Sequence, residues 1–171
     1  VSDKTFWDAL EASKAPIFAS HSSCKALAPI DRNMTDEMIA ALGKKGGVIQ
    51  INFGCSFLSK AAAEASREFR RGQQAAGAET QTRPRTPPAA IADVVAHIDH
   101  VVKLAGMDAV GIGSDYDGVG FTPTGLEDVS KFPNLTRALL ERGYSAADIR
   151  KIYGGNTLRL MRAVEKAATS R

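Results

Sequence analysis

The sequence predicts an α/β fold in which helices alternate with the strands of a parallel sheet. Short runs of continuous apolar residues, typical of parallel strands buried on both faces, alternate with longer stretches whose apolar residues recur at helical spacing. The chain has 171 residues, of which 44% are hydrophobic, which is enough for one packed domain and short for two. These observations favour a single α/β unit.

The first half of the chain is predicted to run helix, strand, helix, strand, helix, at residues 2–14, 15–22, 34–47, 47–54 and 58–77. Ser2 caps the first helix. Thr35 caps the second, which ends at the glycine pair Gly46 and Gly47. Both strands are apolar runs, the second of them rich in β-branched residues, and the last helix is rich in alanine.

The second half begins with a segment, 78–88, in which prolines and charges interrupt all periodicity, and we expect a loop inside the domain there. A strongly amphipathic helix follows at 89–106, and a strand at 108–118 carries Asp115 and Asp117 at its end. Two or three short helices complete the chain. Ser145 is predicted to cap one of them, and the pair Gly154 and Gly155 is predicted to end a helix.

Composition excludes several classes of protein. The net charge is +3, aromatic residues make up only 6%, and no basic stripe with interleaved aromatics is present, so we expect no nucleic-acid partner. The chain shows no signal peptide and no apolar run long enough to span a membrane, which leaves the compartment open: cytoplasmic or periplasmic if the protein is bacterial. Cys24 and Cys55 are expected to be reduced core-edge residues.

The three predicted strands end at His21, Phe53 and Asp115. Because the carboxyl ends of parallel strands carry the chemistry of α/β folds, we expect one shared site there. His21 is either a functional residue or a hydrogen-bonded core histidine. Arg32, eleven positions later, is either a solvated loop charge or a guanidinium that binds a carboxylate through two parallel hydrogen bonds. Asp115 and Asp117 are also what a simple turn would contain.

Two further histidines, His97 and His100, have the i,i+3 spacing of a possible metal pair. The apolar face of their helix is centred near Ile98, and we therefore interpret both as surface or rim residues. The run GIGSDYDG matches neither a dinucleotide-binding loop, which would need glycine at Tyr116, nor an EF-hand, in which glycine would come later than Gly118.

Four segments carry a resemblance to a known family: PIFASHSSCKALAPIDRN, KKGGVIQINFGCSFLS, HIDHVVKLAGMDAVGIGSDYDGV and LEDVSKFPNLTRALLERGYSAADIRKIYGGNTLRLM. They resemble, in order and over nearly the whole chain, the C-terminal half of the membrane (renal-type) dipeptidase family. The resemblance implies an α/β (β/α)8 barrel of the amidohydrolase type. Residues 1–171 would then be the C-terminal portion of a single barrel domain, about its last three βα units, without the N-terminal half.

The same resemblance implies zinc-dependent hydrolysis of dipeptides, including those with a D-residue at the second position, at a site with two zinc ions. By position in the family motifs, His21 is a metal ligand and Arg32 binds the substrate's terminal carboxylate. Asp115 is a catalytic residue that contacts the amino end of the substrate, and Tyr116 stands where the family has phenylalanine. The remaining metal ligands belong to the N-terminal half, which we expect as a partner, so this chain alone is expected to be inactive. Homodimers are common in the family.

Two other interpretations remain open: a catalytically silent α/β fragment, and another amidohydrolase-type hydrolase that acts on lactams or phosphoesters. A metal-binding imidazole together with a carboxylate fork, at His21 and Arg32, favours the dipeptidase, because a phosphoester hydrolase would not need both.

Overall fold

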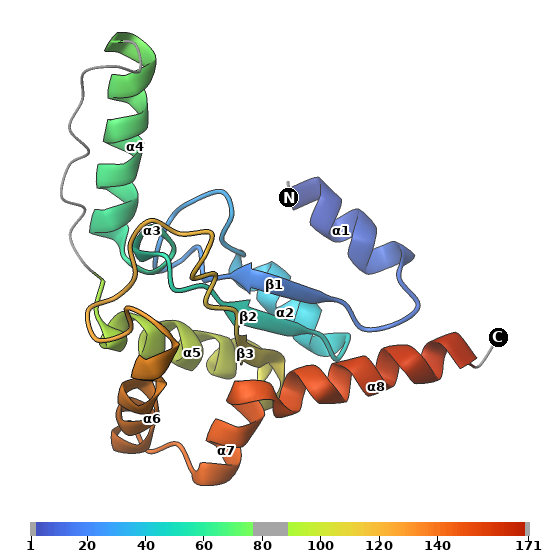
Figure 1. The fold of residues 1–171 in the computed structure, drawn as a ribbon. Helices are drawn as coiled ribbons and strands as arrows, with labels where there is room; N and C mark the ends of the chain where they lie inside the picture. The colour runs from blue at the N-terminus through green and yellow to red at the C-terminus, as the bar shows by residue number, and fades with distance from the viewer. Residues whose placement is uncertain (1–2, 77–88, 170–171) are drawn as a thin grey trace.

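A computed structural model of the chain describes residues 3–76 and 89–169. Its centre is a sheet of three strands: β1 (Phe18–Ser22), β2 (Val48–Ile51) and β3 (Val110–Ile112) (Figure 1). The strand order is β1-β2-β3 and both pairings are parallel, which confirms the predicted α/β class and its three parallel strands. The carboxyl ends of all three strands therefore meet at one edge of the sheet. The predicted loop 78–88 lies outside the described residues.

One face of the sheet packs against two amphipathic helices, α2 (Asp36–Lys44) and α5 (Ile91–Ala105). Thr35 caps α2 as predicted, because its side chain accepts a hydrogen bond from the backbone N of Met38. The residues at the centre of this layer are fully or almost fully buried: Ile39, Leu42, Ile49, Ile51, Val94 and Ile98. Burial of these aliphatic side chains is the main force that holds the helices to the sheet.

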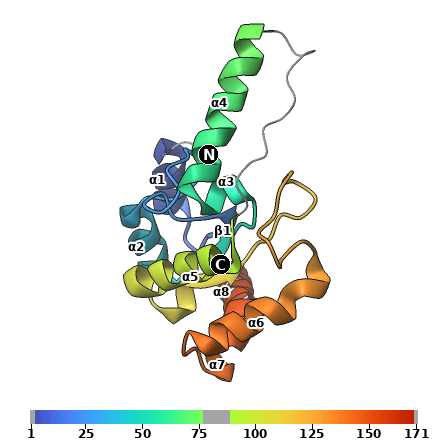
Figure 2. The same cartoon turned by 90° about the vertical axis from the view of Figure 1, so that its left-hand side faces the viewer.

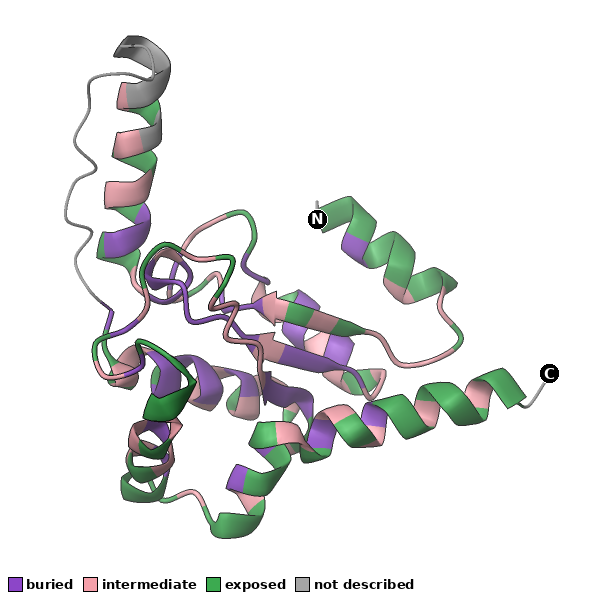
Figure 3. Ribbon diagram, in the orientation of Figure 1, coloured by how far each residue is buried: buried purple, intermediate pink, exposed green. Residues whose placement is uncertain are grey.

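The remaining helices surround this layer or extend away from it (Figures 1 and 2). They are α1 (Asp3–Ala12), α3 (Cys55–Leu58), α4 (Lys60–Ala76), α6 (Phe132–Glu141), α7 (Ala146–Arg150) and α8 (Asn156–Thr169). Short helical turns lie at Met107–Ala109, Val129–Lys131 and Lys151–Gly155. Buried residues gather around the sheet, whereas α1 and the outer turns of α8 are mostly exposed (Figure 3).

The sequence predicted some of these boundaries and missed others. Ser145 caps α7 as predicted, with its side chain accepting from the backbone N of Asp148. The helix α3 was not predicted, and α8, with 14 residues, is longer than the short helices expected there. Among the described residues, no helix combines the length and apolar character that a membrane crossing requires.

The two outer strands leave backbone groups unpaired along one side. Within the described part of the chain, β1 and β3 each pair only with β2. β1 is also poorly covered, since Phe18 is 52% exposed. Open strand edges of this kind are sites where a further strand can add.

Candidate active site

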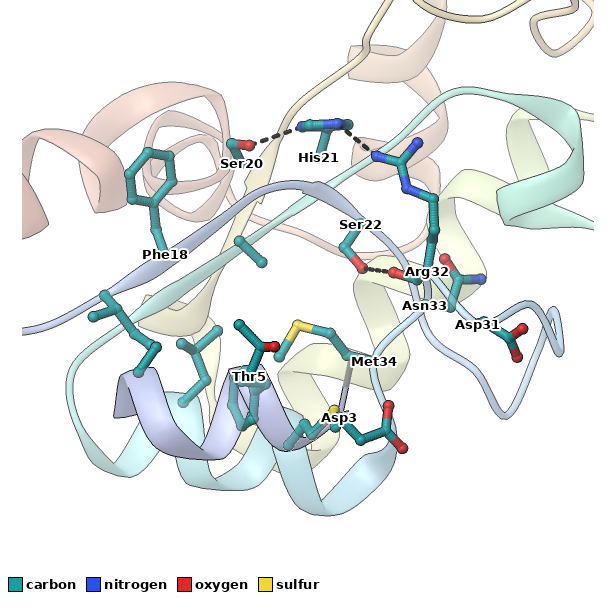
Figure 4. Close-up of a pocket in the computed structure, with 16 residues that line it drawn as sticks. Asp3, Thr5, Phe18, Ser20, His21, Ser22, Asp31, Arg32, Asn33 and Met34 are labelled. Atoms are coloured by element: carbon teal, nitrogen blue, oxygen red, sulfur yellow. Dashed lines mark hydrogen bonds between the residues drawn. The ribbon is translucent and has the colours of Figure 1, made fainter. Parts of the chain in front are cut away.

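The candidate site begins at His21, near the carboxyl end of β1. Arg32 Nη2 lies 2.7 Å from His21 Nε2, and Ser20 Oγ lies 2.8 Å from His21 Nδ1 (Figure 4). A guanidinium can only donate, so Nε2 accepts, and Nδ1 carries the proton that it donates to Ser20. The imidazole is therefore neutral, with its lone pair at Nε2. The predicted site residues His21 and Arg32 are brought together directly.

Arg32 is held from two further sides. Its guanidinium carbon lies 5.0 Å from the centre of the Phe57 ring, a cation–π arrangement. Its backbone oxygen accepts a hydrogen bond of 2.9 Å from Ser22 Oγ. The side chain is thus placed between an imidazole and an aromatic ring while it remains exposed to solvent.

A buried asparagine next to Arg32 fixes the loop 23–34 that carries it. Asn33 is 2% exposed. Its Oδ1 accepts from the backbone N of Ser23 at 3.1 Å, and its Nδ2 donates to the backbone oxygens of Ala28 at 2.8 Å and Phe57 at 2.9 Å. One side chain therefore ties both ends of the loop to each other and to α3.

The prediction that His97 lies at the surface or rim is wrong, because His97 is 0% exposed. Its Nδ1 accepts from the backbone N of Cys24 at 3.0 Å, and its Nε2 donates to the backbone oxygen of Leu58 at 3.0 Å. Burial, opposed by the bond to Leu58, lowers the pKa of His97 to about 4. Both ring nitrogens find backbone partners, which is why a histidine can occupy the core at this position.

His100 has a different environment from His97 and does not share a ligand position with it. Its Nε2 lies 2.8 Å from Asp36 Oδ1 on α2, and its side chain is 20% exposed. This histidine is at the rim of the α2–α5 contact, as predicted. The i,i+3 spacing thus corresponds to two unrelated structural contacts.

Asp115 lies beyond the end of β3, in a turn that constrains its carboxylate. Its Oδ2 accepts from Asn52 Nδ2 at 3.0 Å, and its φ of 60° places it in the left-handed region, which aspartate tolerates better than most residues. The backbone N of Gly118 donates to Asp115 O at 3.0 Å. A Cβ at Gly118 would overlap Asp115 Oδ1, so only glycine fits there without a shift. Asp117, in contrast, is exposed.

Asn52, fully buried at the end of β2, connects the two halves of the site. Its backbone N donates to Ser22 O at 3.0 Å and its side chain binds Asp115. A Cβ at Gly113 would overlap the backbone oxygen of Ser20, so the chain after β3 also approaches β1 closely. The three strand ends therefore share one edge, as expected, and Asn52 links Asp115 to β1.

Tyr116 anchors the Asp115 turn to the core. Its ring lies 5.7 Å from the ring of Phe53 and 6.5 Å from that of Phe132. Its hydroxyl donates to Asp128 O at 3.1 Å, and burial together with Asp128 and Glu127 raises its pKa to about 12. The tyrosine therefore makes aromatic contacts and adds one hydrogen bond.

A pocket of about 360 Å³ lies between α1, β1 and α2 and includes His21 and Arg32 in its lining. Its apolar wall includes Phe6, Met38 and Leu42. Figure 4 shows Met34 on one side of β1 and His21 on the other, so the apolar wall and the polar groups flank the edge of the strand.

The donor atoms of the described residues fit a metal only in part. Among these residues, no group of three or more His, Cys, Asp or Glu side chains could hold a metal ion. His21 offers one neutral imidazole nitrogen, whereas a catalytic zinc site usually has about three protein ligands. This part of the chain can therefore supply a ligand but not a complete site.

The supporting residues Asn33, Asn52 and His97 were not predicted to belong to the site. The position of Asn52 directly after a buried apolar run was the one usable signal, because a polar residue at the end of a parallel strand faces the edge where ligands bind. Asn33 and His97 gave no such signal, since their partners are backbone atoms of distant segments.

Comparison with known proteins gives a consistent result. The profile of the family described as membrane dipeptidase (peptidase family M19) matches residues 1–171. An uncharacterized dipeptidase of Schizosaccharomyces pombe is 37% identical over 169 residues, which cover 98% of this chain and 35% of that protein. The dipeptidase tcpJ of Claviceps purpurea is 38% identical over 170 residues, covering 99% of this chain and 34% of that protein.

Solved structures are similar as well. A metallo peptidase from Rhodobacter sphaeroides, liganded with a phosphinate mimic of the dipeptide L-Ala-D-Ala, is 30% identical with a TM-score of 0.76, and the match covers 94% of this chain and 40% of that one. The probable dipeptidase PvdM from Pseudomonas aeruginosa is 32% identical with a TM-score of 0.79, covering 96% of this chain and 49% of that one. The chain thus spans about a third of the length of these curated relatives.

Proposed function

The chain belongs to the membrane dipeptidase family, peptidase family M19, and from this premise we propose that the complete protein that carries it is a zinc-dependent dipeptidase. The observation that carries the proposal is the contact between Arg32 and His21. A guanidinium, whose geometry matches a carboxylate, lies with its Nη2 2.7 Å from Nε2 of an imidazole at the carboxyl end of a parallel strand. A site that binds a free carboxylate beside the reacting centre selects the last peptide bond of a chain, and recognition of the amino end as well restricts the substrate to a dipeptide.

We propose further that the three strands are part of a (β/α)8 barrel and that residues 1–171 form the C-terminal portion of that single domain. The parallel order and the open edges of β1 and β3 support this proposal, because in a barrel both edges would pair with neighbouring strands. The match to 40% of the Rhodobacter sphaeroides peptidase agrees with a partial barrel. The remaining strands, and the metal ligands on them, would come from the rest of the protein.

In this proposal His21 holds one of two zinc ions. When bound, such a pair polarises the scissile carbonyl and supplies a hydroxide near neutral pH. The hydrogen bond from Nδ1 of His21 to Ser20 fixes the tautomer whose lone pair lies at Nε2. Arg32 donates to that lone pair here, and a zinc ion would take the place of this hydrogen bond. All five N–H groups of Arg32 would then be available to the carboxylate of the substrate.

Asp115 is assigned to the amino end of the substrate. A carboxylate pairs with an ammonium group, and its bond with Asn52 uses only one of its lone pairs. The turn at Gly118 restricts where the carboxylate can move. Arg32 and Asp115 together would then recognise the two charged ends of a dipeptide.

We propose that dipeptides with a D-residue at the second position are among the substrates, in line with the ligand of the Rhodobacter sphaeroides peptidase. The test is a panel of dipeptides, C-terminally amidated dipeptides, a lactam and a phosphoester, given to the complete protein before and after removal of metal by a chelator. We expect hydrolysis of free dipeptides alone, its loss in the chelator and its return with zinc. Full activity in protein shown by metal analysis to be metal-free would refute the metal role.

A further inference from the structure

A second pocket, of about 360 Å³, opens beside Arg32, between the loop that follows β1 and the helices α3 and α4. Its lining includes three arginines, Arg32, Arg67 and Arg71, and one acidic residue, Asp31. Phe57, which is buried, gives it an apolar wall. Because its lining contains three guanidinium groups and one carboxylate, the pocket has a net positive charge and favours an anion.

Two of these charges come from one face of α4. Arg67 and Arg71 are four residues apart and project from the same side of the helix. Like charges at this spacing repel each other, and an anion bound between them relieves the repulsion. Arg67 also donates a hydrogen bond through Nη2 to the backbone oxygen of Pro29, which ties it to the loop that carries Arg32. The pocket is therefore fixed to the loop of the candidate site, although it lies outside the contact between His21 and Arg32.

We propose that this pocket binds the acidic side chain of a substrate's C-terminal residue, so that dipeptides ending in aspartate or glutamate are preferred. The inference rests on the proposed function, in which Arg32 holds the C-terminal carboxylate. The α-carbon of the C-terminal residue is bonded directly to that carboxylate, so its side chain starts next to Arg32, which also lines the pocket. The side chain of the N-terminal residue starts beyond the peptide bond and is farther away.

The test compares isosteric substrate pairs on the metal-loaded complete protein: Ala-Glu with Ala-Gln, and Ala-Asp with Ala-Asn, with the second residue in both L and D forms. We expect kcat/KM to favour the acidic member at low salt, and the preference to shrink as salt rises, because the arginines are exposed. Arg67→Gln and Arg71→Gln should each reduce the preference by about fivefold, the upper range for an exposed ion pair.

Three controls separate this role from a structural one. Arg67→Lys keeps the charge and should retain most of the preference. Arg162→Gln removes an exposed arginine of α8, which lies at the other end of the molecule from α4, and should leave the preference unchanged (Figure 1). Hydrolysis of the neutral dipeptide Ala-Ala should be the same in the four variants as in the wild-type protein.

A ratio near one in the wild-type protein, or a ratio that both glutamine variants leave unchanged, would overturn the inference while the dipeptidase assignment stands. Hydrolysis of no dipeptide at all would refute the proposed function, and the inference would fall with it. Loss of Ala-Ala hydrolysis in the Arg67→Gln and Arg71→Gln variants, in parallel with the loss for acidic substrates, would show a structural role and also contradict it.

Discussion

Acidification should destabilise this protein through His97, the fully buried histidine of α5. Its pKa in the folded state is lowered to about 4, chiefly by burial. The nearby charged groups act in opposite directions, since His100 lowers this pKa further and Asp93 raises it. Because the folded pKa lies below the unfolded one, the unfolded state binds the proton more tightly. The stability that the neutral ring provides is therefore complete above about pH 6.5 and is lost as the pH falls toward 4.

The magnitude follows from the two pKa values. The ordinary pKa of histidine is 6.5, and the pKa of His97 in the folded protein is about 4. At about 1.4 kcal/mol for each pH unit between them, full protonation of the unfolded state removes about 3 kcal/mol from the free energy of unfolding. This is a large share of the stability of a typical domain.

The assay is chemical denaturation of the metal-free complete protein from about pH 7.5 to about pH 4.5, for wild type and His97→Gln. At the higher pH, we expect the variant to be less stable by about 1–3 kcal/mol, because glutamine cannot bind both Cys24 N and Leu58 O as the ring does. At the lower pH, the free energy of unfolding of the wild-type protein should fall by about 2–3 kcal/mol relative to that of the variant, because only the wild-type protein has a histidine that titrates at this position.

Ile98→Val is the matched control, because Ile98 is fully buried beside His97 and does not titrate. It should lower the free energy of unfolding by about 1 kcal/mol at every pH. A gap between wild type and His97→Gln that stays constant across the range, as for Ile98→Val, would show that the histidine is not held neutral and would refute the reasoning.

Two further predictions concern the candidate site. Arg32→Ala should raise KM for dipeptides by about 10- to 150-fold, because a charge-assisted pair with the carboxylate is lost. An unchanged KM would rule out the carboxylate role. Gly118→Ala should lower kcat/KM by about tenfold with little change in Tm, because the new methyl group displaces the carboxylate of Asp115. Wild-type kinetics in this variant would indicate that Asp115 does not need its present position.

The sequence predicted the sheet because its evidence is local. Buried parallel strands read as largely apolar runs, and β2 is such a run apart from Gln50, with Val48, Ile49 and Ile51 all 1% exposed or less. Helix starts are local too, and Thr35 and Ser145 both cap helices where predicted. The short helix α3 was missed because four residues do not establish a helical period.

The edge of the sheet at which the candidate site lies was predictable, whereas the buried residues that support it were not. Strand direction assigned His21 to the carboxyl edge of the sheet, and the family resemblance added Arg32 from the loop that follows. The bonds of His97 to Cys24 and Leu58 could not be predicted, because they join residues 73 and 39 positions apart and form only when the loop, α3 and α5 pack together. A periodicity argument assigns each residue to one face of its own helix, and it contains no information about distant backbone partners.

The side chains that would meet a substrate and those that hold them differ systematically in burial. Arg32 is exposed and His21 and Asp115 are partly exposed, whereas Asn33, Asn52 and His97 are at most 2% exposed. Each of the buried three hydrogen-bonds backbone or side-chain atoms of separate segments, and a buried polar group left unpaired costs about 1–3 kcal/mol. A change in the loop or the turn that breaks these hydrogen bonds therefore carries this cost. The position of Arg32 is accordingly set by residues that touch no substrate, and substitutions at Asn33 should change KM for dipeptides even though the guanidinium itself is intact.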